Sequence, residues 1–404
     1  MSTGPAVAAS AQPLTVADCV KRALALAPAV DAASAASEAS RADLAEARAP
    51  LRPELHSAIE YNQAPGYDQR ISNRGLSSAQ LVADYLAFDG GRRLAQVRAA
   101  RYAAEAAAIG VEAARAQIVL DTETAYFDLL RARKAESELG SSFARLARFA
   151  SMVKALVRNG RAIADDSLKI EVARGQAELA FDAARHARQR SSIVLGSFIG
   201  SYGQDDLAIA EPGPPSPPQL QNLSHNQELQ ARQRQLDAAG SAIDAARAER
   251  YPTFRIELTT GFVGVDPPQT IDHRGGASYD GLFSLPIFDG GAISAHIDRA
   301  TAHQHQARAE LRQTELELSR RLAEADSRYR EAVQALALLA RTRSAADDVF
   351  ELGWARFLGG GHITLLEVLD AYSQAERLRL DLLDQEFAAR QATAEAALIL
   401  GVNR

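Results

Sequence analysis

The feature that most constrains the fold is a duplication that spans nearly the whole chain. The tetrapeptide FDGG occurs at 88–91 and again at 288–291, an offset of 200 residues. The tripeptide ARA, with a proline four residues after it, occurs at 47–49 and at 246–248, an offset of 199 residues. Similarity at a nearly fixed offset indicates a repeated structural unit. The sequence therefore predicts two copies of one supersecondary unit.

A proline-rich segment at 211–221 separates the two copies and contains the run EPGPPSPP. Proline does not fit a helix interior and favours an extended backbone, so we expect this segment to be a linker. The predicted organisation is an N-terminal segment at 1–13, a first repeat at 14–210 and a second repeat at 222–404.

Each copy contains a long stretch in which a helix can run without interruption. Proline is absent between Gly66 and Glu211 and from Ile287 to the end of the chain. Within these stretches, 92–157 and 292–357 are rich in alanine, leucine and charged residues. As an α-helix, each would extend ~100 Å, which exceeds an ordinary globular domain.

Glycine turns at 159–160 and 359–361 end the two long stretches, so the chain must reverse there. Shorter helical patterns lie at about 15–49, 164–199, 226–250 and 364–400. Two short helices placed end to end match one long helix in length. This arithmetic predicts a long antiparallel bundle with coiled-coil packing.

Between the short and the long helices of each copy, the hydrophobic period changes to that of a strand. Alternation of apolar and polar residues runs along 254–262 and 279–287 in the second copy, and along 54–61 and, more weakly, 78–88 in the first. A period of two with one apolar face indicates strands. The predicted β-hairpins span about 53–88 and about 252–288.

Each predicted strand has about 10 residues, which is enough to cross a hydrocarbon core when tilted. Polar loops near 64–77 and 265–277 connect them. Four strands cannot close a barrel, and an apolar face toward lipid tolerates no open edge. Three copies, a homotrimer, would give a 12-stranded barrel, so the strand count predicts oligomerisation. The alternative is a soluble α+β protein whose hairpins pack on a helix.

Composition and motifs exclude other classes of protein. No run of 18 apolar residues is present, so we expect no membrane-spanning helix. The net charge of −6 without a basic stripe argues against nucleic acid as a partner. We find no phosphate-binding glycine loop and no recognisable nucleophile, and His303 and His305 fall on different helix faces. The sequence predicts no enzyme, no metal site and no cofactor.

Two N-terminal features bear on localisation. Residues 1–13 have neither a basic region nor an apolar run long enough for a secretory signal. Cys19 follows the charged residue Asp18, a poor context for lipidation, and we expect it to be an ordinary helix residue.

From about Leu14 to Gly401 the chain resembles the TolC family of outer-membrane efflux and secretion channels. The resemblance rests on the duplicated order together with the segments LTV at 14–16, ETAYF at 123–127 and LLEVLDA at 365–371. It implies a mainly α fold with a small transmembrane β part. In such a fold an elongated helical barrel of long antiparallel coiled-coil helices joins a trimeric 12-stranded β-barrel, to which each protomer contributes four strands.

The resemblance also implies a function. Such a channel is the exit duct of a tripartite export system, located in the outer membrane with a periplasmic extension. Its partners are a periplasmic adaptor and an inner-membrane ABC or proton-driven transporter, in type I protein secretion or small-molecule efflux. The segment NGRA at 159–162 slightly favours protein secretion over small-molecule efflux. The alternative is a soluble periplasmic coiled-coil adaptor, which leaves the hairpins unexplained.

Acidic residues just after the glycine turns are the candidate gate, because three-fold symmetry would turn each into a ring of carboxylates. By the resemblance, Glu367 and Asp370 match the family's paired acidic positions, and Asp165 or Asp166 falls where a gating aspartate is expected. Glycine and leucine occupy 358–361, where the best-known channels have tyrosine. The alternative is that these acids only stabilise solvated helix N-termini.

Two further groups of residues follow from the pattern. Glycine permits a sharp strand-to-helix turn and aspartate caps the helix start, so the two FDGG segments are expected to be architectural elbows. The elbow residues are Asp89, Gly90, Gly91, Asp289, Gly290 and Gly291. Alternation predicts that the barrel lumen is faced by Arg255, Glu257 and Asp280. The alternative is that they have no specific role, because a water-filled barrel interior is polar in any case.

Overall fold

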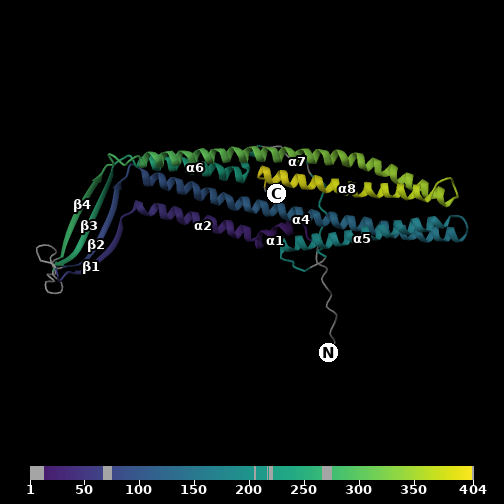
Figure 1. Cartoon of the computed structure of the whole chain (residues 1–404), viewed down its shortest axis with the longest axis horizontal. Coiled ribbons are helices and arrows are strands. Elements are labelled where there is room, and N and C mark those ends of the chain that lie inside the picture. Colours follow the sequence, from purple (N-terminus) through teal and green to yellow (C-terminus); the bar gives the residue numbers. More distant parts are fainter. Residues whose placement is uncertain are drawn as a thin grey trace, which may run out of the picture. The chain divides into compact units, whose positions relative to one another are not determined.

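The computed structural model describes residues 13–66, 75–203, 206–215, 217, 222–265 and 275–402. The predicted hairpin loops near 64–77 and 265–277, and the segment at 1–13, lie largely outside the described residues. The helices are α1 (Val16–Leu26), α2 (Pro28–Arg48), α4 (Arg92–Arg158), α5 (Ala164–Ile199), α6 (Gln227–Ala248), α7 (Ala292–Leu358) and α8 (Leu365–Leu400) (Figure 1). The strands are β1 (Glu54–Gln63), β2 (Gly75–Phe88), β3 (Thr253–Val265) and β4 (Gly275–Ser284).

The chain divides into two compact units, and each draws residues from both repeats. Unit 1 comprises Met1–Asp31, Glu112–Asn226 and Leu316–Arg404, and unit 2 comprises Ala32–Val111 and Gln227–Glu315. Unit 1 therefore holds the glycine turns and return helices, and unit 2 holds the sheet.

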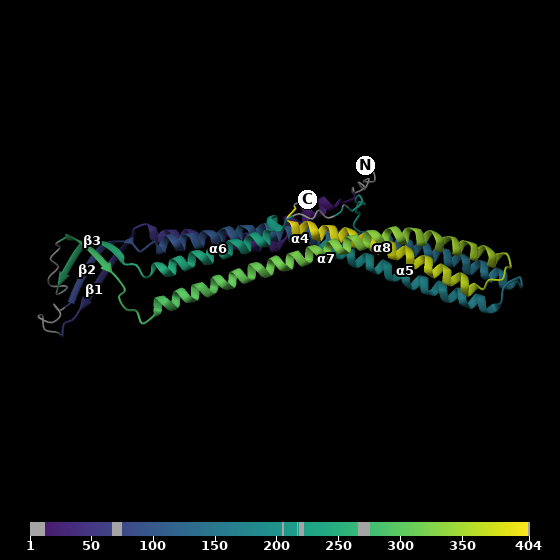
Figure 2. The ribbon, with the colours of Figure 1, turned by 90° about the horizontal axis from the view of Figure 1, so that it is seen from above.

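The two long helices form as predicted. Both α4 and α7 have 67 residues and end before a glycine with positive φ, Gly160 at 67° and Gly360 at 76°. The return helices α5 and α8 have 36 residues each. In unit 1, α4 lies beside α5 and α7 beside α8 (Figures 1 and 2). Lys154 of α4 forms an ion pair with Glu171 of α5.

One predicted helix is broken. The sequence predicted a single helix at about 15–49, but α1 ends at Leu26 and α2 begins at Pro28. Proline disfavours a helical conformation in the residue before it, and Ala27 accordingly adopts φ −76° and ψ 107°. The prediction was wrong because Pro28 was not counted as a helix breaker.

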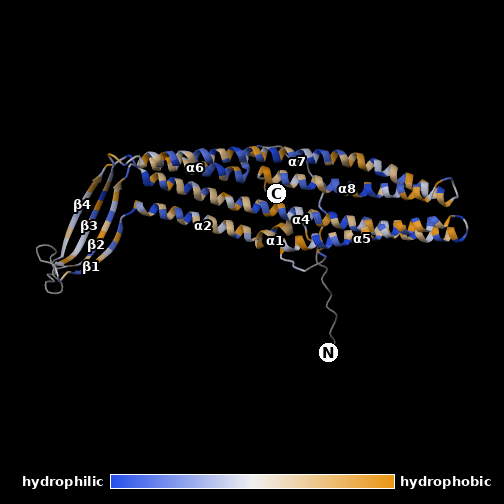
Figure 3. Ribbon diagram, viewed as in Figure 1, coloured by the Kyte–Doolittle hydropathy of each residue, from blue (hydrophilic) through white to orange (hydrophobic). Residues whose placement is uncertain are grey.

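The four strands form one antiparallel sheet in the order β1-β2-β3-β4 (Figure 1). The central pair, β2 with β3, joins the two repeats. The strands carry both apolar and polar residues (Figure 3), and the two alternate most regularly along β3, from Phe254 to Phe262. The strand predicted to reach Ile287 ends at Ser284, since Pro286 has no N–H to give to a ladder.

Strand register places the predicted apolar residues on one face. Leu55 lies opposite Ala83, which lies opposite Leu258, which lies opposite Tyr279. This face is exposed: Ile59 is 81% accessible and Tyr279 is 80% accessible. None of the helices in the described residues combines the length and apolar content that crossing a bilayer requires.

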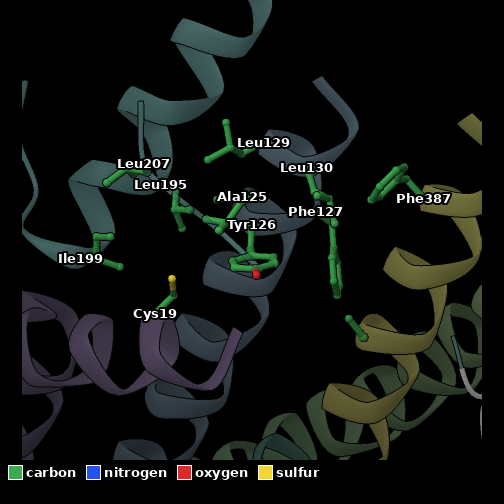
Figure 4. Close-up of a cluster of buried hydrophobic side chains, with 12 residues drawn as sticks. Cys19, Ala125, Tyr126, Phe127, Leu129, Leu130, Leu195, Ile199, Leu207 and Phe387 are labelled. Carbon is green, nitrogen blue, oxygen red and sulfur yellow. The ribbon is translucent and has the colours of Figure 1, made fainter. Parts of the chain in front are cut away.

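Tyr126 organises the first hydrophobic cluster of unit 1 (Figure 4). Its ring packs near Cys19 and Leu195, and its hydroxyl lies 3.0 Å from the Leu14 carbonyl oxygen and 2.5 Å from that of Ala210. A parallel bridge between Leu14 and Ile209 brings these two carbonyls together. Burial raises the pKa of Tyr126 to about 12, so the hydroxyl remains a donor.

A second, aromatic cluster lies closer to the glycine turns. The Phe149 and Trp354 rings are 4.1 Å apart between centroids, and the Phe350 and Tyr372 rings are 5.0 Å apart. These residues come from α4, α7 and α8, so the cluster packs helices of both repeats against each other.

The two FDGG elbows share one hydrogen-bonding pattern. Asp89 accepts from the amides of Gly91 at 3.1 Å and Arg93 at 2.9 Å. Asp289 accepts from the amides of Gly291 at 3.0 Å and Ile293 at 2.6 Å. These backbone bonds help to hold the pKa of both carboxyls below the usual range, although burial works against them at Asp89.

The elbows differ in their surroundings. The first is buried, and the Arg93 guanidinium bonds Asp89 at 2.8 Å and the Pro50 carbonyl at 2.6 Å. The second has Ile293 in place of arginine, and Asp289 is exposed. The same turn is therefore held by an arginine in the first repeat and is exposed in the second repeat.

Substitution of glycine in the two elbows should separate backbone strain from steric clash. Gly90 and Gly290 have nearly equal φ, 66° and 65°, but a Cβ on Gly90 would lie 2.5 Å from the Tyr251 Cβ, whereas one on Gly290 meets nothing. Gly290→Ala should cost about 1–2 kcal/mol for left-handed backbone alone. Gly90→Ala should cost about 1–3 kcal/mol more. Thermal melting of the detergent-extracted protein measures both, and equal losses would contradict the packing described.

Removing the Tyr126 hydroxyl should loosen the bridge between Leu14 and Ile209. Tyr126→Phe leaves the partly buried Ala210 carbonyl without this donor, at an expected cost of about 1–3 kcal/mol. Amide hydrogen exchange at Leu14 and Ala210 should accelerate. Tyr202→Phe is the control because its side chain is 80% exposed. Unchanged exchange at both amides would show that the hydroxyl contributes nothing to the bridge.

Candidate gate and pore surface

Two of the four predicted gate carboxylates close helix N-termini. Glu367 is the third residue of α8 and accepts bonds from the Thr364 amide at 2.8 Å and the Thr364 hydroxyl at 3.0 Å. Asp166 holds the equivalent place in α5, is buried, and accepts from the Ile163 amide at 3.4 Å. The bonds from Thr364 lower the pKa of Glu367. These two acids therefore have local structural roles.

The other two carboxylates are exposed but differ in charge environment. Asp165 forms an ion pair with Lys169 at 2.6 Å, which raises the pKa of that lysine. Asp370 accepts from the Gln374 amide at 2.8 Å and has no cationic partner in the described part of the chain. Asp370 occupies the sixth position of α8, where α5 has Lys169. Among the four predicted gate carboxylates, Asp370 is therefore the best candidate for a charge that no nearby cation neutralises.

A groove in unit 1 brings the first turns of α5 and α8 together. It has a volume of about 800 Å³, and Lys169 and Asp370 both line it. Its walls are mainly apolar and exposed, including Leu168, Val172 and Leu366 at 68%, 61% and 61% accessible. Asp165, Asp166 and Glu367 do not line this groove.

The polar face of the sheet carries a row of carboxylates across all four strands. Glu54 lies opposite Asp84, Asp84 opposite Glu257, and Glu257 opposite Asp280. Residues directly opposite in an antiparallel pair share a face, and like charges there are destabilising. One cation reduces this repulsion, since Arg255 forms an ion pair with Asp84 at 3.3 Å. We call these four acids the carboxylate row.

Of the carboxylate row and its partner Arg255, the sequence predicted three residues and missed two. The sequence placed Arg255, Glu257 and Asp280 on the polar face, and strand register puts Glu257 and Asp280 side by side. Glu54 and Asp84 were not singled out as lumen residues, although each lies on the polar side of its strand. The missing information was register, which decides whether acids on neighbouring strands fall at one level.

The described residues contain no group of three or more histidine, cysteine, aspartate and glutamate side chains suited to a metal ion. His296 Nδ1 lies 2.9 Å from a carboxylate oxygen of Glu249. Cys19 is buried, and burial raises its pKa to about 11, so its thiol is protonated at neutral pH.

Comparison with known proteins identifies the family that has this architecture. A family model described as "Outer membrane efflux protein" matches 19–201 and 220–402, one segment in each repeat. Protein CyaE of Bordetella pertussis is 27% identical over 322 residues, covering 75% of this chain and 66% of CyaE. The cobalt-zinc-cadmium resistance protein CzcC of Cupriavidus metallidurans is 25% identical, covering 92% of this chain and 86% of CzcC.

Among solved structures, CusC aligns with a TM-score of 0.89 at 18% identity, covering 96% of this chain and 92% of CusC. That similarity establishes the fold: long helices with four antiparallel strands per chain. Since the family model covers both repeats, this chain is a member of the outer membrane efflux protein family, as its duplication and its resemblance to TolC predicted.

Proposed function

We propose that this protein is the outer-membrane exit duct of a tripartite export system and acts as a homotrimer. The observation that carries the proposal is the sheet, which has one exposed apolar face, one polar face and two unpaired edges, β1 and β4. In lipid, backbone groups at a strand edge must find partners. Pairing of β4 with β1 of the next copy satisfies them, and three copies close twelve strands.

Closing the barrel gives each face of the sheet a role. The apolar face, which includes Ile59 and Tyr279, meets lipid, and the polar face lines the lumen. The carboxylate row then becomes a ring of twelve acids, four from each of three copies. A ring of carboxylates concentrates cations in a pore, so the duct should prefer cations to anions.

The candidate gate belongs to unit 1. We assign Asp370 as the charge at the periplasmic entrance, since Asp166 and Glu367 are engaged in capping and Asp165 is paired with Lys169. The FDGG elbows, with Asp89 and Asp289, are architectural and couple each hairpin to its long helix. No chemical step is required, because substrate is driven by an inner-membrane ABC or proton-driven transporter.

The apolar groove between α5 and α8 supplies the contact surface for other subunits. Exposed leucines and valine at its rim are the composition expected of a surface that another helix covers. We assign it to the contacts within the trimer and with a periplasmic adaptor. A soluble adaptor, the alternative for this chain, would leave the exposed apolar face of the sheet without a partner.

The direct test is reconstitution of detergent-extracted protein into a planar bilayer. The proposal predicts extraction only with detergent and discrete, long-lived conductance steps. A protein that is released without detergent and gives no conductance would overturn it and favour the adaptor.

Neutralising the carboxylate row should reduce cation preference. For Glu257→Gln combined with Asp280→Asn, six of the twelve ring charges disappear in a trimer, and the reversal potential in a potassium chloride gradient should move toward zero. Glu257→Asp is the matched control because it keeps the charge. An unchanged reversal potential in the neutral variant would place these acids outside the conduction path.

Removing the Asp370 charge should weaken block by multivalent cations added on the periplasmic side. A divalent cation at ~8 Å from a carboxylate in water is attracted by about 1 kcal/mol before screening by salt, so removing three such charges by Asp370→Asn should lower the apparent affinity of a divalent cation by roughly tenfold or more. Thr364→Ala disturbs the neighbouring cap but keeps every charge. If Thr364→Ala lowers the affinity as much as Asp370→Asn, the effect comes from helix fraying.

A further inference from the structure

A pocket lined by four arginines lies in unit 1, apart from the candidate gate. Its volume is about 460 Å³. Arg145 and Arg148 come from α4, Arg343 from α7 and Arg379 from α8, and Glu138 is the acidic residue in the lining. The pocket thus joins helices of the first and second repeats.

Nearby carboxylates engage only part of this positive charge. Arg379 is buried and bonds Asp347 at 2.5 Å and Glu376 at 3.2 Å. Arg343 shares Asp347 at 3.5 Å. With both acids assigned to these two arginines, the rest of the cluster has no ion pair in the described part of the chain.

Arg145 and Arg148 form no ion pair in the described part of the chain, and Arg145 also hydrogen-bonds the Tyr372 side chain. The Arg145 guanidinium lies 5.8 Å from the centre of the Tyr372 ring, and its Nε is buried without a hydrogen-bond partner. A buried N–H that makes no bond is costly and rare in folded proteins. Arg148 is exposed beside it, one turn further along α4.

This chemistry suits an oxyanion. Guanidinium groups form paired, charge-assisted hydrogen bonds with phosphate and carboxylate oxygens, and they do so better than ammonium groups. We propose that the pocket binds a small multivalent oxyanion of the phosphate type, held by Arg145 and Arg148 with Arg343 at the rim. Bound there, the anion links α4 to α7 and α8 and stabilises the packing of these helices against one another.

The proposal does not depend on conduction, because it concerns the packing of unit 1. The test uses full-length, detergent-extracted protein and sodium pyrophosphate as the probe, against sodium chloride at matched ionic strength so that general screening is equal. We expect a saturable rise in melting temperature with pyrophosphate only. Slower amide exchange near Arg145 in α4 and near Arg379 in α8 should accompany it.

Arg148→Gln combined with Arg343→Gln is the diagnostic variant, because neither side chain is buried and the fold should survive. Its apparent affinity for pyrophosphate should fall at least about fivefold. Arg341→Gln is the control, an exposed arginine on the same helix that does not line the pocket. Equal affinity in the two variants, or a wild-type shift that sodium chloride reproduces, would overturn the proposal.

Discussion

The constraint on which the rest of the structure depends is the hydrogen bonding of an open four-stranded sheet. β1 and β4 each leave one edge of backbone donors and acceptors unpaired, and one face of the sheet is apolar and exposed. Water can bond the edges of a single chain, but the apolar face would remain exposed to it. In a membrane, lipid covers the apolar face and joining copies edge to edge pairs the strand edges, so the polar face, with its carboxylate row, encloses the lumen.

The helices solve a different problem, that of holding long, thin, alanine-rich elements in register without a thick core. In unit 1 this is done by specific polar anchors set in small apolar clusters. Tyr126 ties the segment before α1 to the segment after α5, and Tyr372 bonds Ser142 at 2.6 Å across from α8 to α4. Burying such groups is favourable only when they are paired, so each anchor specifies one alignment of helices that alanine packing alone would leave free to slide.

Much of this fold could be predicted from the sequence because its signals are periodic and local. The FDGG repeats, the proline-free stretches and the alternation along β3 required no knowledge of distant contacts. The break before Pro28 and the end of β4 at Ser284 were equally local and were missed only because single prolines were not weighed. The candidate site was harder to predict. Strand register decides that Glu54 and Asp84 lie level with Glu257, and helix capping distinguishes Asp166 from Asp165. The arginine pocket draws on three helices that are far apart in sequence.

Closure of the sheet by identical copies is the central claim, and the mass of the detergent-extracted particle tests it most directly. Native mass spectrometry after removal of detergent in the gas phase should give three times the 43.3 kDa mass of one chain. Trimers should persist on dilution, because each contact is made through backbone hydrogen bonds along a whole strand edge. A stable 43.3 kDa species at all concentrations would show that the edges of β1 and β4 are satisfied within one chain and would contradict the account.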